Sequence, residues 1–273
     1  MDLHLQDKVV IVTGGAAGIG AAISLQLAAE GAIPVICGKS PMAAEFEDAL
    51  MRSQPKARFF QFDLEQEVDC RGMVQETIAE FGRIDGLVNN AGRGMLEISG
   101  DYNRTPALFW QADPQGFGHI IDANVTGAFL MARACVPAMV AQGYGRVVNI
   151  STSRQTMVRT GSCPYGPSKA ALEAMSVIWA KDLQGSGVTV NVLLPGGASD
   201  TRLLPDSGSG RRGADGQLLA PALMRAPIVW LMGHAGPEVN GERYIARLWR
   251  TDQPWDRAAA AARDERHELP AIM

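Results

Sequence analysis

The chain has 273 residues, of which 47% are hydrophobic and 20% charged, and its formal net charge is −4. This composition is typical of a folded globular protein with room for one large α/β domain, and it excludes a largely disordered chain. The negative net charge gives no electrostatic reason to expect nucleic acid or an anionic membrane as a partner.

Cysteine and histidine are sparse, and neither forms a ligand pattern. The four cysteines are scattered without a C-x-x-C spacing, at Cys37, Cys70, Cys135 and Cys163. We interpret them as core thiols of a reducing compartment and expect no metal site. The sequence shows no apolar run of the roughly 18 residues that a membrane span needs. Because residues 1–4 lack a basic-then-apolar signal pattern, a cytoplasmic protein without a membrane partner is expected.

The first motif combines a short apolar run with a cluster of glycines. Residues 8–12 (KVVIV) are typical of a strand buried on both faces, and residues 21–31 have a helical composition that ends at Gly31. Between them lies TGGAAGIG at 13–20. A strand, a glycine-rich turn and a helix in this order cradle a pyrophosphate against the helix N–H groups. The flanking elements favour this interpretation over an ordinary glycine-rich loop.

The second predicted strand, 33–37, ends in Gly38-Lys39-Ser40. In dinucleotide-binding folds the residue after this strand faces the adenosine ribose, where an acid favours NAD and a basic residue tolerates the 2′-phosphate of NADP. This chain has Lys39 and no acid there, so NADP is expected, with NAD still possible. The alternative is that Lys39 is only a solvated loop charge.

Strands and helices alternate through the rest of the chain. Further helices are expected at 43–50, 68–81, 120–139, 165–184 and 222–232, and further strands at 58–62, 84–88, 145–150, 188–194 and 243–248. This alternation predicts a single-domain α/β Rossmann fold, with a doubly wound parallel sheet of about seven strands and helices on both faces. The domain is expected over 1–250, and a helical tail, with its helix at 258–268, over 251–273.

Polar and glycine-rich segments follow several of these strands. They are the glycine turn, Lys39, Asp63, residues 89–92 and residues 151–153. Ligands of open parallel sheets bind at the carboxyl ends of the strands. All five segments are therefore expected to meet at one ligand-binding edge.

Two glycine- and proline-containing stretches interrupt the alternation. Residues 93–118 are expected to be irregular, either as a functional cover or as a surface excursion held by its aromatic side chains. Residues 199–221 are expected to be exposed and mobile, as a substrate lid or as an excursion without function.

A candidate catalytic pair lies in the helix at 165–184. Tyr165 and Lys169 are four residues apart, so they share one helix face. An ammonium group beside a phenol favours the phenolate and lowers the phenol pKa. With a hydroxyl from 151–153 to hold a carbonyl oxygen, this pair suits carbonyl reduction or alcohol oxidation. Tyr-x-x-x-Lys alone also occurs by chance in many helices.

Taken together, these motifs resemble the short-chain dehydrogenase/reductase family, in particular its NAD(P)-dependent members of the 3-oxoacyl-reductase-like type. The resemblance covers about residues 5–248. The motifs that carry it are residues 13–20, Asp63-Leu64, residues 89–92, Asn124, residues 149–152, Tyr165-x-x-x-Lys169 and Pro195-Gly196.

The resemblance implies roles for individual residues. Tyr165 would be the general acid of reduction, Lys169 would lower its pKa and bind the nicotinamide ribose, and Asn124 would hold a water in the proton relay. The substrate-orienting hydroxyl would be Thr152, which stands at the family spacing, or Ser153, which we slightly prefer because it is unbranched. The implied cofactor-binding residues are Gly14, Gly18, Ile19, Gly20, Lys39, Asp63, Leu64, Asn90, Ala91, Gly92, Tyr165, Lys169, Pro195 and Gly196.

The implied activity is hydride transfer between NADP(H) and a small carbonyl or secondary-alcohol substrate, in a homodimer or homotetramer. Three departures from the family pattern stand out. A threonine, Thr152, stands where the family has its substrate-orienting serine, the threonine after Pro195-Gly196 comes one residue late, at Thr201, and the C-terminal end is unfamiliar. Two alternatives remain open. One is a catalytically weak or inactive dinucleotide-binding regulator or scaffold, and the other is non-redox chemistry such as elimination.

Overall fold

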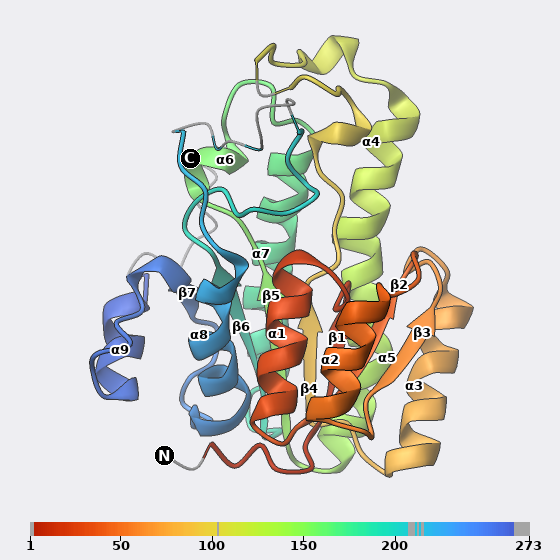
Figure 1. Cartoon of the computed structure of the whole chain (residues 1–273), viewed down its shortest axis with the longest axis vertical. Coiled ribbons are helices and arrows are strands. Elements are labelled where there is room, and N and C mark those ends of the chain that lie inside the picture. Colours follow the sequence, from red (N-terminus) through yellow and green to blue (C-terminus); the bar gives the residue numbers. More distant parts are fainter. Residues whose placement is uncertain (1–2, 103, 207–210, 212, 214–215, 265–273) are drawn as a thin grey trace.

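A parallel sheet forms the centre of the computed structural model, which describes residues 3–102, 104–206, 211, 213 and 216–264. In this part of the chain the sheet has seven strands in the order β3-β2-β1-β4-β5-β6-β7 (Figure 1). The strands are β1 (Val9–Thr13), β2 (Ile33–Gly38), β3 (Arg58–Gln61), β4 (Gly86–Asn89), β5 (Gly145–Ile150), β6 (Val188–Leu194) and β7 (Arg243–Ile245). The strand order reverses between β1 and β4, at the switch point where such sheets bind ligands. The predicted doubly wound Rossmann fold is confirmed.

Helices cover both faces of the sheet (Figure 1). They are α1 (Gly18–Ala29), α2 (Ala44–Ser53), α3 (Glu67–Phe81), α4 (Pro114–Ile121), α5 (Gly127–Ala141), α6 (Arg154–Met157), α7 (Tyr165–Asp182), α8 (Arg225–Val229) and α9 (Trp255–Ala262). Each predicted strand is present at a position close to the expected one, as are the helices predicted at 21–31, 43–50, 68–81, 120–139 and 165–184.

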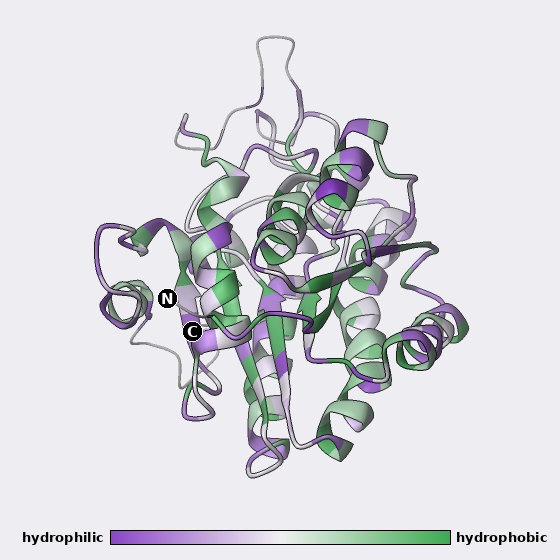
Figure 2. Ribbon diagram, turned by 60° about the horizontal axis from the view of Figure 1, so that its bottom comes forward, coloured by the Kyte–Doolittle hydropathy of each residue, from purple (hydrophilic) through white to green (hydrophobic). Residues whose placement is uncertain are grey.

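Alternation along the strands builds the two hydrophobic cores. In β1, Val10 and Val12 pack with α1 and α8 on one face, whereas Val9 and Ile11 pack with α3, α5 and α7 on the other. Successive side chains of a strand point to opposite faces, so a strand that is apolar throughout must be covered on both sides. Figure 2 shows the apolar strands in the interior between the helices.

Three of the cysteines belong to the second core. Cys37, Cys70 and Cys135 are buried there, and Cys163 is partly exposed. Burial raises the pKa of the Cys37, Cys70 and Cys135 thiols, that of Cys70 to about 12. The interpretation as core thiols is therefore confirmed for these three cysteines, and it was wrong for Cys163, which is partly exposed.

The structure corrects the expected irregular stretch 93–118. Short 3₁₀ turns form at η1 (Met95–Glu97) and η2 (Phe109–Gln111), and α4 begins at Pro114. An Asp113 side-chain oxygen accepts a 2.8 Å hydrogen bond from the Gly116 backbone N–H. Asp at the cap followed by Pro at the first helical position is a standard helix start. The expectation of irregular chain to residue 118 was wrong because Asp113 and Pro114 start a helix within this glycine-containing stretch.

The long apolar helix that follows is part of the core. From Pro114 to Ala141, α4, the π-helical turn η3 (Asp122–Thr126) and α5 run on as one helix. Among the described residues it is long and apolar enough to cross a membrane, but half of its most apolar window is buried inside the fold. Its α5 portion packs on α3, β4 and β5. Burial against the sheet accounts for its apolar composition.

The C-terminal part differs in detail from the expected elements. The helix predicted at 222–232 is divided into η4 (Pro221–Met224), α8 and the π-helical turn η5 (Trp230–His234), and β7 is followed by η6 (Ala246–Leu248). Helix α9 buries Ala258, Ala259 and Ala262 in the first core. The described part of the tail is thus joined to the same fold, while 265–268 of the predicted tail helix lie outside the described residues.

Replacing the cap residue tests the assigned start of α4. Asp113→Ala should lower the free energy of unfolding by about 1 kcal/mol, because the Gly116 N–H loses its acceptor. Urea unfolding followed by circular dichroism measures this. Gln115→Ala, in the same turn of the same helix, is the matched control and should cause a much smaller change. Equal losses in both variants would contradict the capping role of Asp113.

Candidate active site

A cavity of about 1060 Å³ opens where the strands end. Residues directly after β1, β2, β4, β5 and β6 line it. The predicted site residues among its lining are Gly14, Gly18, Ile19, Lys39, Asp63, Leu64, Asn90, Ala91, Gly92, Thr152, Ser153, Tyr165, Lys169, Pro195 and Gly196. The structure therefore brings these segments together at one edge of the sheet, as expected. Gly20 and Asn124 lie behind this lining.

The glycine turn after β1 requires its glycines. Gly14 and Gly18 have φ angles of +62° and +52°, a region that favours glycine. A Cβ on Gly20 would lie 2.1 Å from the Gly14 carbonyl oxygen. The Asn90 side chain donates to the carbonyls of Thr13 and Gly14 at 2.9 and 3.1 Å. The Asn90 side chain thus stabilises the turn by hydrogen bonds. Sequence analysis predicted that this residue contacts the ribose of the cofactor.

Lys39 lies at the end of β2, at the mouth of the cavity. Its Nζ is 2.6 Å from Asp63 Oδ2, and its side chain is 66% exposed. Burial raises the pKa of the Asp63 carboxyl, but hydrogen bonds from Lys39 and the Glu65 backbone, with the charges of Lys39 and Arg93, bring the pKa below its ordinary value. Lys39 therefore has both solvent access and a carboxylate neighbour.

Asn124 lies in the π-helical turn η3 and is buried. Its Oδ1 accepts a 2.8 Å hydrogen bond from the Arg93 N–H, and its Nδ2 donates to the Arg93 carbonyl at 3.0 Å and to Ser168 Oγ at 2.9 Å. These bonds fix the segment after β4 against α7. The side chain predicted to hold a water is engaged in holding the backbone.

Burial shifts the pKa values of Tyr165 and Lys169 in opposite directions. It raises the pKa of the Tyr165 phenol, while a hydrogen bond with Thr152 and the charge of Arg159 act in the opposite direction. It lowers the pKa of Lys169 to about 8, against the charge of Glu173, and Lys169 Nζ donates to the Ile150 carbonyl at 2.9 Å. Overall the Tyr165 pKa is raised, in contrast to the expected lowering, because desolvation outweighs the interactions with Thr152 and Arg159.

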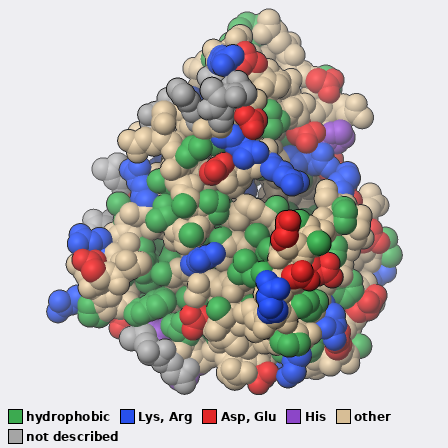
Figure 3. All heavy atoms as spheres, in the orientation of Figure 1, with side chains coloured by type: hydrophobic (Ala, Val, Ile, Leu, Met, Phe, Trp, Pro, Cys, Tyr) green, Lys and Arg blue, Asp and Glu red, His purple; other side chains and the backbone are tan. Residues whose placement is uncertain are grey.

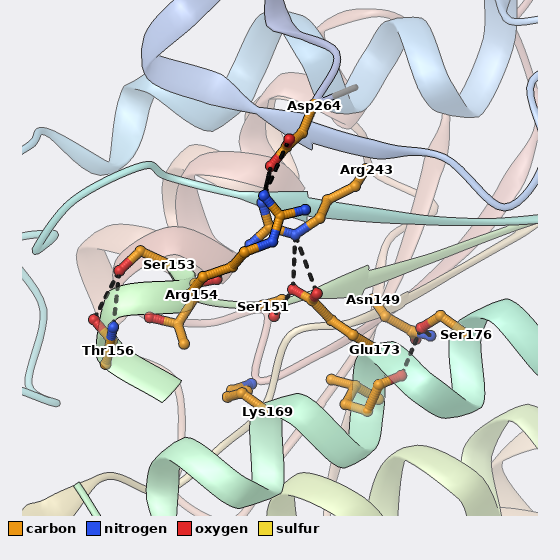
Figure 4. Close-up of polar contacts among 12 residues, drawn as sticks. Asn149, Ser151, Ser153, Arg154, Thr156, Lys169, Glu173, Ser176, Arg243 and Asp264 are labelled. Carbon is orange, nitrogen blue, oxygen red and sulfur yellow. Dashed lines mark hydrogen bonds and ion pairs between the residues drawn. The ribbon is translucent and has the colours of Figure 1, made fainter. Parts of the chain in front are cut away.

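The two candidate hydroxyls have different partners. Ser153 is the N-cap of α6: its Oγ accepts from the Thr156 N–H at 3.2 Å and is 2.9 Å from Thr156 Oγ1 (Figure 4). The Thr152 side chain lies close enough to the Tyr165 phenol to lower its pKa. The geometry favours Thr152 as the hydroxyl beside Tyr165, in contrast to the slight preference for Ser153, because a helix cap already uses the serine.

Comparison with known proteins agrees with this geometry. The short chain dehydrogenase family model matches residues 8–211. L-fucose dehydrogenase of Bos taurus is 35% identical over 72% of this chain and 68% of that protein. The 3-oxoacyl-acyl-carrier-protein reductase FabG of Thermotoga maritima is 32% identical over 71% of this chain and 75% of the reductase.

The chain belongs to the short-chain dehydrogenase family. Sorbitol-6-phosphate 2-dehydrogenase of Klebsiella pneumoniae is a third relative, 31% identical over 71% of this chain and 70% of that enzyme. The crystal structure of Cj0485 dehydrogenase superposes with a TM-score of 0.74 at 23% identity, covering 89% of this chain and 94% of that one. This last likeness supports the fold. Membership places the protein among oxidoreductases that use a nicotinamide dinucleotide.

The lining of the cavity of this short-chain dehydrogenase suits a dinucleotide in its charge and its hydrogen-bonding groups. Eight Lys or Arg residues and three Asp or Glu residues line it, although the whole chain is negative. Figure 3 shows Lys and Arg side chains gathered around the hollow. Within the described residues, the buried Ser199 hydroxyl at the cavity has no hydrogen-bond partner. A polyanionic ligand would meet the excess of cations, and Ser199 offers it a hydrogen bond.

Sequence reasoning missed four residues around this site. Ser199 was treated only as part of the lid, while Glu173, Arg243 and Asp264 form a buried ionic contact beside Thr152. A charge inside the apolar strand predicted at 243–248 was the available signal for Arg243, since a buried charge is retained only with partners. Nothing local in the sequence indicates that Asp264 reaches the same place.

The beginning of the stretch 199–221 borders the cavity, at Ser199 and residues 201–204. Tyr102 Oη donates to the Leu203 carbonyl at 3.1 Å, which joins this segment to the stretch after β4. Ser199 forms an isolated bridge with Leu219. Residues 207–210, 212, 214 and 215 of the expected lid lie outside the described residues, and the lid stays a prediction.

The close approach at Gly20 makes a test of the turn. Gly20→Ala should abolish binding of both NADPH and NADH, because the added Cβ would collide with the Gly14 carbonyl and displace the turn. Fluorescence titration of purified protein measures it. Gly72→Ala in α3, where a Cβ meets open space, is the control and should bind normally. Normal binding by Gly20→Ala would contradict the assignment of the turn to the cofactor.

Proposed function

We propose that this protein is an NADP(H)-dependent reductase or dehydrogenase, which transfers a hydride between the cofactor and the carbonyl or secondary alcohol of a small molecule. The observation that carries the proposal is that Thr152, Tyr165 and Lys169 line one cavity together with the glycine turn, with Thr152 close enough to Tyr165 to affect its pKa. Carbonyl reduction needs a site for the nucleotide, a hydroxyl group to hold the carbonyl oxygen and an acid to protonate it. The glycine turn, Thr152 and Tyr165 can supply these at one edge of the sheet.

Tyr165 and Thr152 act together on the substrate oxygen. A phenol whose pKa is raised keeps its proton at neutral pH, so Tyr165 suits donation to the oxygen of a carbonyl under reduction. Thr152 holds that oxygen by its hydroxyl group. When bound, the nicotinamide exchanges the hydride with the substrate carbon. In alcohol oxidation the same phenol, deprotonated, accepts the proton.

Other residues hold the catalytic pair and the cofactor. Lys169 stands one helical turn from Tyr165 and would bond the nicotinamide ribose, while Asn124 fixes the neighbouring backbone. The remaining cofactor contacts are proposed for Gly14, Gly18, Ile19, Gly20, Lys39, Asp63, Leu64, Asn90, Ala91, Gly92, Pro195, Gly196 and Ser199. Lys39 supports NADP over NAD because its exposed ammonium can meet the 2′-phosphate.

The relatives suggest which substrates to try. Their names refer to L-fucose, sorbitol 6-phosphate and a 3-oxoacyl group, so a panel of sugars, sugar phosphates, 3-oxoacyl thioesters and simple ketones is appropriate. We further propose a homodimer or homotetramer. Exposed hydrophobic side chains on α5 (Phe129, Val140) and α7 (Ile178) support subunit contacts.

Removing the phenol oxygen tests the proton donor. Tyr165→Phe should bind NADPH normally but lose turnover by roughly 10² to 10⁴-fold, the usual contribution of a positioned acid. Initial rates over the panel, with either cofactor, measure it. Tyr144→Phe, whose hydroxyl bonds the Met232 carbonyl away from the cavity, is the control. Full activity in Tyr165→Phe would exclude this residue as the acid, and cofactor binding without turnover in the wild type would favour a regulator or scaffold.

Truncating the lysine after β2 tests the cofactor preference. Lys39→Ala should weaken NADPH binding by about tenfold, the value of one charge-assisted hydrogen bond, and should leave NADH binding nearly unchanged. Separate dissociation constants for the two cofactors from fluorescence titration decide this. Lys56→Ala, at a lysine that pairs with Asp7 instead, should affect neither. Equal weakening of both cofactors in Lys39→Ala would contradict the preference for NADP.

A further inference from the structure

A buried arginine lies directly behind the candidate catalytic hydroxyl. Arg243, in β7, is only 5% exposed. Its Nε donates to the two Glu173 carboxylate oxygens at 3.0 and 3.1 Å, its Nη1 to Asp264 Oδ2 at 2.6 Å, and its Nη2 to the Thr152 carbonyl at 2.8 Å. All three guanidinium nitrogens therefore have partners. Figure 4 shows the guanidinium between the carboxylates of Asp264 and Glu173.

Both carboxylates have further contacts near the catalytic residues. Glu173 Oε1 accepts from Ser151 Oγ at 2.5 Å, and Glu173 stands one turn after Lys169 in α7. Asp264 also pairs with Arg154 of α6 at 3.0 Å. We call Arg243, Glu173 and Asp264 the Arg243 cluster. This cluster contacts Thr152 itself and residues on both sides of it, Ser151 and Arg154.

Stability alone is a weak reason for such a cluster. Removing charges from water costs free energy that a buried ion pair only partly recovers, and well-packed apolar residues often do as well. What an apolar side chain could not provide is a donor for the Thr152 carbonyl. Thr152 lies beyond the end of β5, and the last ladder bond at this end joins the Ser151 N–H to the Leu193 carbonyl. Within the described residues, Arg243 therefore donates the hydrogen bond to the Thr152 carbonyl that no neighbouring strand supplies through its backbone.

We propose that Arg243 is a positioning residue that fixes Thr152 beside Tyr165, and that Asp264 from the C-terminal segment holds Arg243 in place. Both residues lie beyond residue 211, where the match to the family model ends. The segment is held to β7 by a 2.8 Å hydrogen bond from the Asp264 N–H to the Arg243 carbonyl. The C-terminal segment of this chain thereby completes the active site. This inference rests on the proposed function.

The test compares three single variants with the wild type. Arg243→Lys keeps the charge but cannot reach three partners at once, because an ammonium lacks the planar fork of the guanidinium. Asp264→Asn leaves Thr152 and Arg243 intact and removes only the charge behind them. Arg263→Gln is the matched control: Arg263 joins the same segment to Glu242 at 2.6 and 2.7 Å, at the surface, without touching Thr152.

Two readouts separate positioning from general loss of structure. Arg243→Lys and Asp264→Asn should lower kcat by about tenfold, since small displacements of catalytic groups are costly, with KM and the cofactor dissociation constant within about twofold of the wild type. Hydrogen exchange in the peptide covering 150–157 should be faster in both. Arg263→Gln should match the wild type in both readouts. The kinetics use the best substrate that the wild type turns over.

The outcomes are distinct. Unchanged kcat and unchanged exchange in both Arg243→Lys and Asp264→Asn would overturn the inference while leaving the proposed function in place. A loss in Arg263→Gln as large as that in Asp264→Asn would also overturn it, since docking of the segment would then be the cause. A wild type without turnover would remove the proposed function, and hydrogen exchange alone would then decide whether the cluster fixes Thr152. If Arg243→Lys does not fold, Asp264→Asn decides.

Discussion

The parallel pairing of all the strands in the sheet is the constraint on which the site depends. Parallel strands end at the same edge, so every segment that leaves a strand there is delivered to one side of the molecule. The glycine turn, Lys39, Asn90, Thr152 and Pro195 are far apart in the sequence and all border one cavity. Covering both faces of the sheet with helices keeps the strands in register and leaves this edge open for ligands.

Backbone beyond the strand ends needs partners that the sheet no longer supplies. Three buried or half-buried side chains meet that need: Asn90 bonds the carbonyls of the glycine turn, Asn124 bonds the backbone of Arg93, and Arg243 bonds the carbonyl of Thr152. Unpaired backbone groups away from water are costly. The same contacts that remove this cost also hold the candidate catalytic groups in one arrangement.

Burial has a second effect, on charge. It raises the pKa of Tyr165 and lowers that of Lys169 to about 8, so both groups are moved towards their neutral forms. The cations around the cavity act in the opposite direction on an acid such as Tyr165. A bound dinucleotide would bring negative phosphates to the cavity. The pKa of the Tyr165 phenol therefore depends on whether the cofactor is bound.

The sequence by itself determined the local features. Apolar β-branched runs, glycine spacing and the Tyr-x-x-x-Lys pattern predicted the strands, the glycine turn and the candidate catalytic pair, because each depends on periodicity or on residues only a few positions apart. Lys39 at the end of β2 was equally readable. The start of α4 was not predicted, although Asp113-Pro114 is a local signal for a helix start, because the surrounding glycines favoured an irregular stretch.

The tertiary structure decided what depends on distant partners. It assigned Ser153 to the cap of α6. It also placed Thr152 next to Tyr165, whose pKa burial raises. It brought Arg243 to Thr152 across a separation of 91 residues, and Asp264 to Arg243 across a separation of 21. Burial and hydrogen-bond partners come from packing between remote segments, and no local pattern in the sequence encodes them.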